Sequence, residues 1–261
     1  MRTTFRNVAI PKEHGGWMFL LEPAIIGLGS GFSLPGLLLT LAALGAFLTR
    51  HPLKLAVDDH LKGKHFSRTT WAESFALLYG LFASIMVVSC ALTAKHPFVL
   101  PLIIAAPAAI LQLYLDATKR GRELLAELSG AVAMSALVAS NMLLAGFGTV
   151  SAFALWVLVM CRVVTSILYV RTRLRLARGQ PIAKRPVWIS HLGAMLVMAL
   201  LAYGTAVPWT ILPVTVLWFI RAYLGLSASK IPVRAQVVGI QEVIIGLVSS
   251  FVVVAGYWLH L

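Results

Sequence analysis

Blocks of apolar residues, each about twenty long, repeat along the chain and are separated by short polar connections. Such a block, as a helix rising about 1.5 Å per residue, crosses roughly 30 Å of hydrocarbon. The blocks must be helical, because a backbone exposed to lipid has to satisfy its own hydrogen bonds. A transmembrane β-barrel would instead alternate apolar and polar residues in segments of about ten, and that alternation is absent. The pattern predicts an all-α integral membrane protein.

The blocks predict about nine transmembrane helices. We expect these spans at residues 16–33, 36–56, 72–93, 97–115, 124–146, 151–171, 187–205, 207–226 and 238–259. Because no linker or low-complexity stretch interrupts the series, residues 1–261 are expected to form a single transmembrane domain.

The connections between the predicted spans differ in charge. Those near residues 30–35, 93–97, 146–151 and 204–208 are short, rich in Gly and Pro, and almost uncharged. Of the 22 Lys and Arg residues, 20 lie at the N-terminus and in the segments 50–70, 116–123, 171–186 and 221–236. Positively charged connections stay in the cytoplasm. The pattern therefore predicts a multi-pass protein of the plasma membrane, with a cytoplasmic N-terminus and an external C-terminus.

The composition agrees with a membrane protein, since 59% of the residues are hydrophobic and only 12% are charged. The formal net charge of +13 would fit a nucleic-acid partner in a soluble protein, but here the charges lie in connections between apolar helices. We therefore expect membrane lipid, and no nucleic acid, as the partner. Cys90 and Cys161 both lie in apolar blocks without a metal-ligand spacing, so we interpret them as core residues. The oligomeric state is left open.

Charged residues at the end of the second span form the first candidate cluster. Arg50, Lys54 and Asp58 follow one another at every fourth position and so share one helical face. Charges inside a bilayer are costly and are therefore functional candidates.

A second cluster lies on the sixth span, where Arg162, Tyr169 and Arg173 share one face and Arg162 is about two turns deep. Glu22 in the first span and Glu127 in the fifth add buried carboxylates. These charges can be interpreted in two ways. They form ion pairs that hold helices together, or they line a cytoplasm-facing cavity whose cations bind an anionic lipid head group. Arg suits the second role because its planar guanidinium binds phosphate with two donors.

Five runs across nearly the whole chain resemble the YwiC-like membrane protein family. They are PKEHGGW (11–17), LEPAIIG (21–27), RHPLK (50–54), YVRTRLR (169–175) and VGIQE (238–242).

More remotely, the layout resembles the UbiA superfamily of intramembrane prenyltransferases. That resemblance implies a UbiA-like bundle of nine helices with a cytoplasm-facing central cavity for an isoprenyl diphosphate. In the superfamily the second helix ends in Asn-Asp-x-x-Asp-x-x-x-Asp, and the corresponding positions here are Arg50, His51, Lys54 and Asp58. The fourth helix ends in Tyr-Pro-x-x-Lys-Arg, which corresponds to Tyr114, Lys119 and Arg120. The sixth helix carries a Tyr followed by Asp-x-x-x-Asp, where this chain has Tyr169, Arg171, Arg173 and Arg175.

In the superfamily, carboxylates at these positions hold Mg²⁺, which holds the diphosphate, whereas most of them are cations here. The comparison implies metal-independent binding with no cofactor, and Mg²⁺ on Asp58 and Asp59 is the alternative. The expected substrate-binding residues are Arg50, His51, Lys54, Lys119, Arg120, Arg162, Arg171 and Arg173. The candidate catalytic residues are Glu22, Asp58, Glu127 and Tyr169, with Glu123 and Glu242 as further candidates for a base.

Three functions remain open from the sequence. The first is prenyl transfer from an isoprenyl diphosphate to a lipophilic acceptor. The second is non-catalytic binding or transport of an anionic lipid or a small anion, which suits the loss of the metal-binding carboxylates. The third is a structural membrane protein whose ion pairs only fix helix packing.

Overall fold

A computed structural model describes residues 6–10, 14–63, 66–227 and 233–260. Within these ranges the chain is helical and contains no strand. The helices are α1 (Arg6–Ala9), α2 (His14–Ser30), α3 (Leu34–Leu61), α4 (Ser67–Thr93), α5 (Val99–Ala117), α6 (Leu124–Leu144), α7 (Thr149–Ala177), α8 (Arg185–Tyr203), α9 (Ile211–Ser227) and α10 (Ala235–Trp258).

Each predicted span lies on one helix, from α2 to α10. Seven described helices are long and apolar enough to cross a membrane, which makes the chain a multi-pass helical membrane protein. Two apolar helices, Gly16–Ser30 and Ile211–Ser227, are shorter. The crossing of all nine spans therefore stays a prediction, whereas α1 is a short helix that the hydropathy pattern did not predict.

Two helices extend well past the predicted ends of their spans. Helix α3 runs to Leu61 instead of residue 56, and α7 runs to Ala177 instead of residue 171. Each ends before a glycine in the left-handed region, Gly63 with φ of 61° and Gly179 with φ of 68°. A glycine adopts this conformation without a Cβ clash and so ends a helix. The extra turns are polar because they continue beyond the apolar block.

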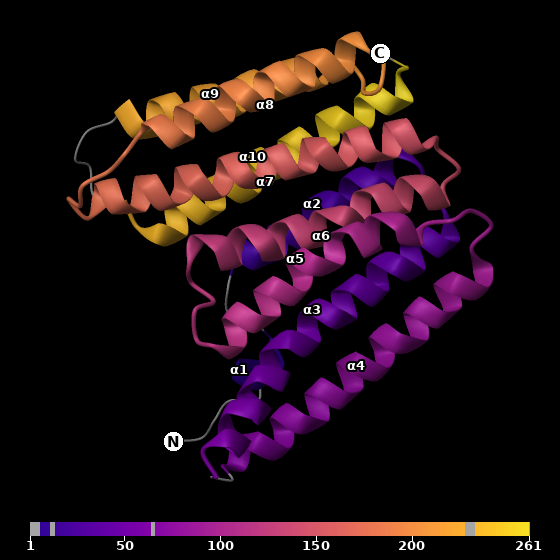
Figure 1. The fold of residues 1–261 in the computed structure, drawn as a ribbon, viewed down its shortest axis with the longest axis vertical. Coiled ribbons are helices and arrows are strands. Elements are labelled where there is room, and N and C mark those ends of the chain that lie inside the picture. Colours follow the sequence, from indigo (N-terminus) through magenta and orange to yellow (C-terminus); the bar gives the residue numbers. More distant parts are fainter. Residues whose placement is uncertain (1–5, 11–13, 64–65, 228–232, 261) are drawn as a thin grey trace.

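The helices form a layered bundle (Figure 1). The hairpin α3–α4 lies at one edge, α8 and α9 lie at the other, and α6 and α7 lie between them. Helices α6 and α7 are the most buried of the candidate spans, with 67% and 61% of their apolar windows buried. The basic connections α3–α4, α5–α6 and α7–α8 gather at one end of the bundle (Figure 1). This common end is what the charge pattern predicted.

Candidate functional site

Four charged side chains meet inside the bundle, one from each of α2, α7, α9 and α10. They are Glu22, Arg162, Arg221 and Glu242, and we call them the buried ionic cluster. Their side chains are between 3% and 10% exposed. Such a group at membrane depth is expensive unless its members are paired, so its geometry is informative about function.

Arg162 is the centre of the buried ionic cluster. Its Nε lies 3.2 Å from Glu22 Oε1 on α2. Its Nη1 donates to Glu242 Oε2 at 3.1 Å, and its Nη2 donates to the backbone carbonyl of Glu242 at 3.2 Å. Its guanidinium also lies 5.7 Å from the centre of the Trp218 ring. One side chain of α7 thus connects α2, α9 and α10.

Arg221 pairs with the same carboxylate from the other side. Its Nη1 lies 2.7 Å from Glu242 Oε1, and its guanidinium lies 4.2 Å from the centre of the Tyr169 ring. None of its three guanidinium nitrogens, however, has an acceptor in hydrogen-bonding geometry within the described part of the chain. Arg221 is therefore held by its charge and by the aromatic ring, and its N–H groups are not aligned with an acceptor.

Two further buried side chains near the buried ionic cluster each have one polar atom without a partner among the described residues. Arg173 lies one turn after Tyr169 on α7, is 6% exposed, and has an Nη1 without a hydrogen-bond acceptor. His191 on α8 is 1% exposed; its Nδ1 lies 2.8 Å from the carbonyl of Val187, and its Nε2 has no partner. Buried polar groups are nearly always hydrogen-bonded, so unpaired ones need an explanation.

The charges of this region do not balance in the described part of the chain. Arg162, Arg173 and Arg221 supply three positive charges, and Glu22 and Glu242 supply two negative charges. An uncompensated charge in a low-dielectric interior costs several kcal/mol. The excess positive charge and the unused donors of Arg173 and Arg221 fit an additional anion.

A glycine allows α9 to approach α7 beside this site. A Cβ at position 225 would lie 2.8 Å from Cζ of Tyr169 and still closer to its hydroxyl. We expect Gly225→Val to lower the free energy of unfolding by about 1–3 kcal/mol, because the buried ring has no room to move. Thermal unfolding in detergent measures this. Gly193→Val is the matched control, since a Cβ there meets nothing within 4 Å; equal losses in both variants would contradict the close approach.

The first sequence-predicted cluster forms a separate contact between α3 and α5. Arg50 donates from Nε to Asp116 Oδ2 at 2.8 Å and also contacts this oxygen through Nη2. Lys54 Nζ lies 3.8 Å from Oδ1 of the same carboxylate, and Gln112 Nε2 donates to Oδ2 at 3.0 Å. Both predicted cations thus share a protein carboxylate, whose role the sequence did not suggest.

The other predicted binding residues are spread over the basic end. Arg120 pairs with Glu123 through two hydrogen bonds, which lower the pKa of Glu123. Arg171 Nη1 lies 2.8 Å from Glu127 Oε2. The structure therefore places the predicted residues in several ion pairs, and the cavity that would unite them stays a prediction.

Three predicted residues lie outside these pairs. Lys119 is exposed in the turn after α5, with φ of 61°. His51 Nε2 lies 3.2 Å from the carbonyl of Asn7. Asp58 is half-buried on the polar last turn of α3. In the part of the chain that the structure describes, none of the three forms an ion pair with the buried ionic cluster.

Asp59, one of the two carboxylates that would hold a magnesium ion, is already engaged by the protein. Asp59 accepts two hydrogen bonds from Arg68, at 2.7 and 3.1 Å, and one from Thr69 at 3.0 Å. A carboxylate engaged in this way has little capacity left for a cation. Among the residues that the structure describes, no group of three or more His, Cys, Asp or Glu side chains is arranged to hold a metal.

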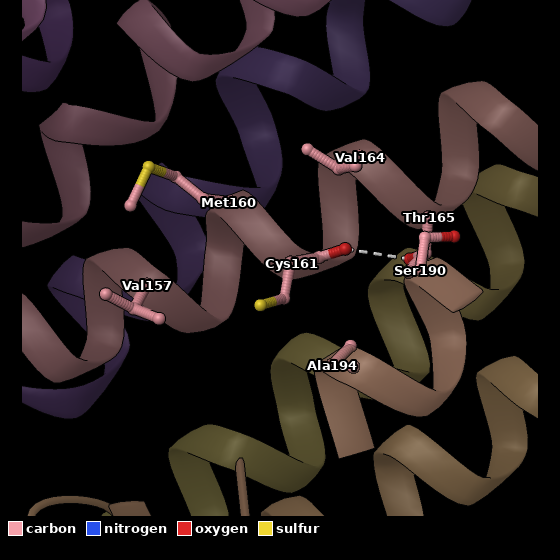
Figure 2. A pocket seen from close by; sticks show the side chains of 8 residues that line it. Val157, Met160, Cys161, Val164, Thr165, Ser190 and Ala194 are labelled. Carbon is pink, nitrogen blue, oxygen red and sulfur yellow. Dashed lines mark hydrogen bonds between the residues drawn. The ribbon is translucent and has the colours of Figure 1, made fainter. Parts of the chain in front are cut away.

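A groove of about 310 Å³ lies between α7 and α8 (Figure 2). Its lining is apolar, since the hydroxyl of Thr165 donates to the carbonyl of Cys161 at 2.8 Å and that of Ser190 to Val187 at 2.9 Å. No charged residue lines it. The groove is therefore suited to hydrocarbon and is not the cation-lined cavity that the sequence predicted.

Sequence reasoning missed Arg221, Trp218 and His191. Arg221 was assigned to a basic connection, 221–236, although the hydropathy pattern placed it inside the span 207–226. That overlap was the available signal. The structure resolves it, because Arg221 lies within α9 and its side chain is only 8% exposed.

A protein-family model described as YwiC-like protein matches residues 10–142 of the chain. The match covers α2 to α5 and nearly all of α6, including Glu22, Arg50 and Asp116. No curated protein and no solved structure matches the chain.

Proposed function

The chain belongs to the YwiC-like protein family, and we propose that this multi-pass membrane protein binds the diphosphate head group of an isoprenyl lipid directly through arginine side chains. One observation carries the proposal. Arg173 Nη1 and the three guanidinium nitrogens of Arg221 are buried, yet in the described part of the chain none of them has a hydrogen-bond acceptor, and the surrounding charge is positive.

The chemistry of the ligand follows from that of the donors. Guanidinium groups recognise phosphate through paired N–H donors, and such charge-assisted hydrogen bonds are roughly twice as strong as neutral ones. A diphosphate would supply both the missing negative charge and several acceptor oxygens. The helices around it are apolar, which suits a hydrocarbon chain attached to the head group.

Prenyl transfer is the second candidate, and the position of Tyr169 favours it. In that reaction the allylic C–O bond breaks, pyrophosphate leaves with the electron pair, and the acceptor bonds to the allylic carbon while losing a proton. The Tyr169 ring lies under Arg221 and one turn from Arg173. An aromatic face beside the head group could stabilise the allylic cation.

The carboxylates favour binding over transfer. Glu22, Glu127 and Glu242 are all paired with arginines, so a proton transferred to any of them would weaken that ion pair. Asp58, which forms no ion pair in the described ranges, would remain as a base. Binding without turnover is therefore our primary proposal, and the likeness to the UbiA superfamily stays a prediction.

The test is equilibrium binding to the purified full-length protein in detergent. Geranylgeranyl diphosphate, inorganic pyrophosphate and geranylgeraniol are compared, each with Mg²⁺ and with EDTA. We expect both diphosphates to bind saturably in EDTA, and the alcohol not to bind. Tighter binding of geranylgeranyl diphosphate than of pyrophosphate would identify a lipid ligand, and the reverse would identify a free anion. Absence of saturable binding, or a requirement for Mg²⁺, would contradict the proposal.

A further inference from the structure

The two carboxylate oxygens of Glu242 face different helices. Oε2 accepts a hydrogen bond from Ser166 Oγ at 2.5 Å and one from Arg162 Nη1 at 3.1 Å, both on α7. Oε1 lies 2.7 Å from Arg221 Nη1 on α9. A single side chain of α10 therefore lies between cations of two helices.

The two carboxylate oxygens of Glu242 are not equally well hydrogen-bonded. Oε2 has two donors in hydrogen-bonding geometry, whereas Oε1 has no hydrogen bond and only the ion pair with Arg221. Arg162 also keeps a second carboxylate, Glu22, and a bond to the backbone carbonyl of Glu242. Of the two arginines, Arg221 therefore loses fewer contacts when it separates from Glu242.

We propose that Glu242 is an internal anion that occupies Arg221 until the ligand arrives, and that the bound diphosphate then takes over Arg221 together with Arg173. Arg162 and Ser166 remain bound to Glu242 during this exchange. The inference rests on the proposed function, because it names Glu242 as the group that competes with the ligand for Arg221.

In this exchange the Arg221 side chain turns while helix α9 stays in place. Helix α9 remains attached to α10 through the Trp218 indole, which donates to Ser249 Oγ at 2.8 Å. A diphosphate carries more negative charge than a carboxylate and offers more acceptors, so it competes favourably for a guanidinium whose donors are unused. Since coupling is reciprocal, Glu242 weakens ligand binding as much as the ligand weakens the Arg221 pair.

Glu242→Gln tests this competition. Loss of the internal negative charge should tighten binding of inorganic pyrophosphate to the full-length protein by about fivefold or more, the usual range for coupling between sites. Glu73→Gln is the matched control, because Glu73 pairs with His60 in the α3–α4 hairpin, and its affinity should match that of the wild type. Unchanged or weaker binding by Glu242→Gln would overturn the inference.

Glu242→Asp keeps the negative charge, and it is the variant to measure if Glu242→Gln does not fold. Because its side chain is one methylene shorter, we expect the carboxylate of the Glu242→Asp variant to hold Arg221 less closely, so the affinity of this variant for pyrophosphate should lie between those of wild type and Glu242→Gln. Affinity no higher than that of the wild type would count against the competition. If wild type binds and neither variant binds more tightly, only the inference fails. If neither wild type nor variants bind pyrophosphate or geranylgeranyl diphosphate, the proposed function fails as well.

Discussion

Replacing Arg162 with Leu is expected to lower the free energy of unfolding by about 3–5 kcal/mol, because in the described part of the chain it leaves Glu22 without a cationic partner and Glu242 with Arg221 alone as one. Removing one member of a buried pair costs more than the pair itself contributes, since the remaining charge stays desolvated. The measurement is thermal unfolding in detergent, where we expect the midpoint to fall by about 10 °C.

Arg171→Leu is the control for this loss. Arg171 pairs with Glu127, but the two side chains are 28% and 36% exposed, so removal of the pair should cost less than about 1 kcal/mol. In addition, Glu22→Gln in the Arg162→Leu background should recover part of the stability, because it removes the charge left unpaired. Equal losses for Arg162→Leu and Arg171→Leu would contradict a structural role for the buried ionic cluster.

The double variant Arg173→Leu, Arg221→Leu is expected to weaken binding of pyrophosphate and geranylgeranyl diphosphate by at least about 100-fold. A hydrogen bond to a charged group contributes about 1.5–3 kcal/mol, and two guanidiniums are lost together. Arg221→Leu also removes the ion pair with Glu242, so thermal unfolding in detergent checks that the double variant is folded. Equilibrium binding in EDTA measures the effect.

Two matched double variants decide where the head group binds. Arg175→Leu with Arg178→Leu removes two exposed arginines from the same end of the bundle and should leave the affinity within about twofold. Arg50→Leu with Lys54→Leu removes the cations that share Asp116. Loss of binding in this last variant, with normal binding in Arg173→Leu, Arg221→Leu, would move the site to α3 and α5.

The family was predictable because its signature is a set of local residue runs. The resemblance to the YwiC-like family, noted from runs such as LEPAIIG and RHPLK, is confirmed by the match over residues 10–142. The depth of Arg162 was predictable for a similar reason, since its distance from the end of an apolar block is a property of the chain alone. The structure confirms that Arg162 is buried.

The pairing of the charges was not predictable in the same way. The helical spacing placed Arg50 and Lys54 on one face, but nothing local indicated that Asp116 would lie opposite them. In the same way, Glu22 and Glu242 are more than two hundred residues apart and meet only because both reach Arg162. Helical spacing tells which residues share a face, and it does not tell which face of another helix they meet.

The hydropathy and charge patterns were sufficient to predict that the chain is helical, that it crosses a membrane, and that its basic connections lie together. These features follow from the free energy of transferring each block into lipid, which depends on the residues of that block. Which cations pair with a carboxylate, and which have N–H groups without an aligned acceptor, became visible only in the packed helices. That outcome depends on the rotation and depth of each helix against its neighbours, because an ion pair forms only within about 4 Å.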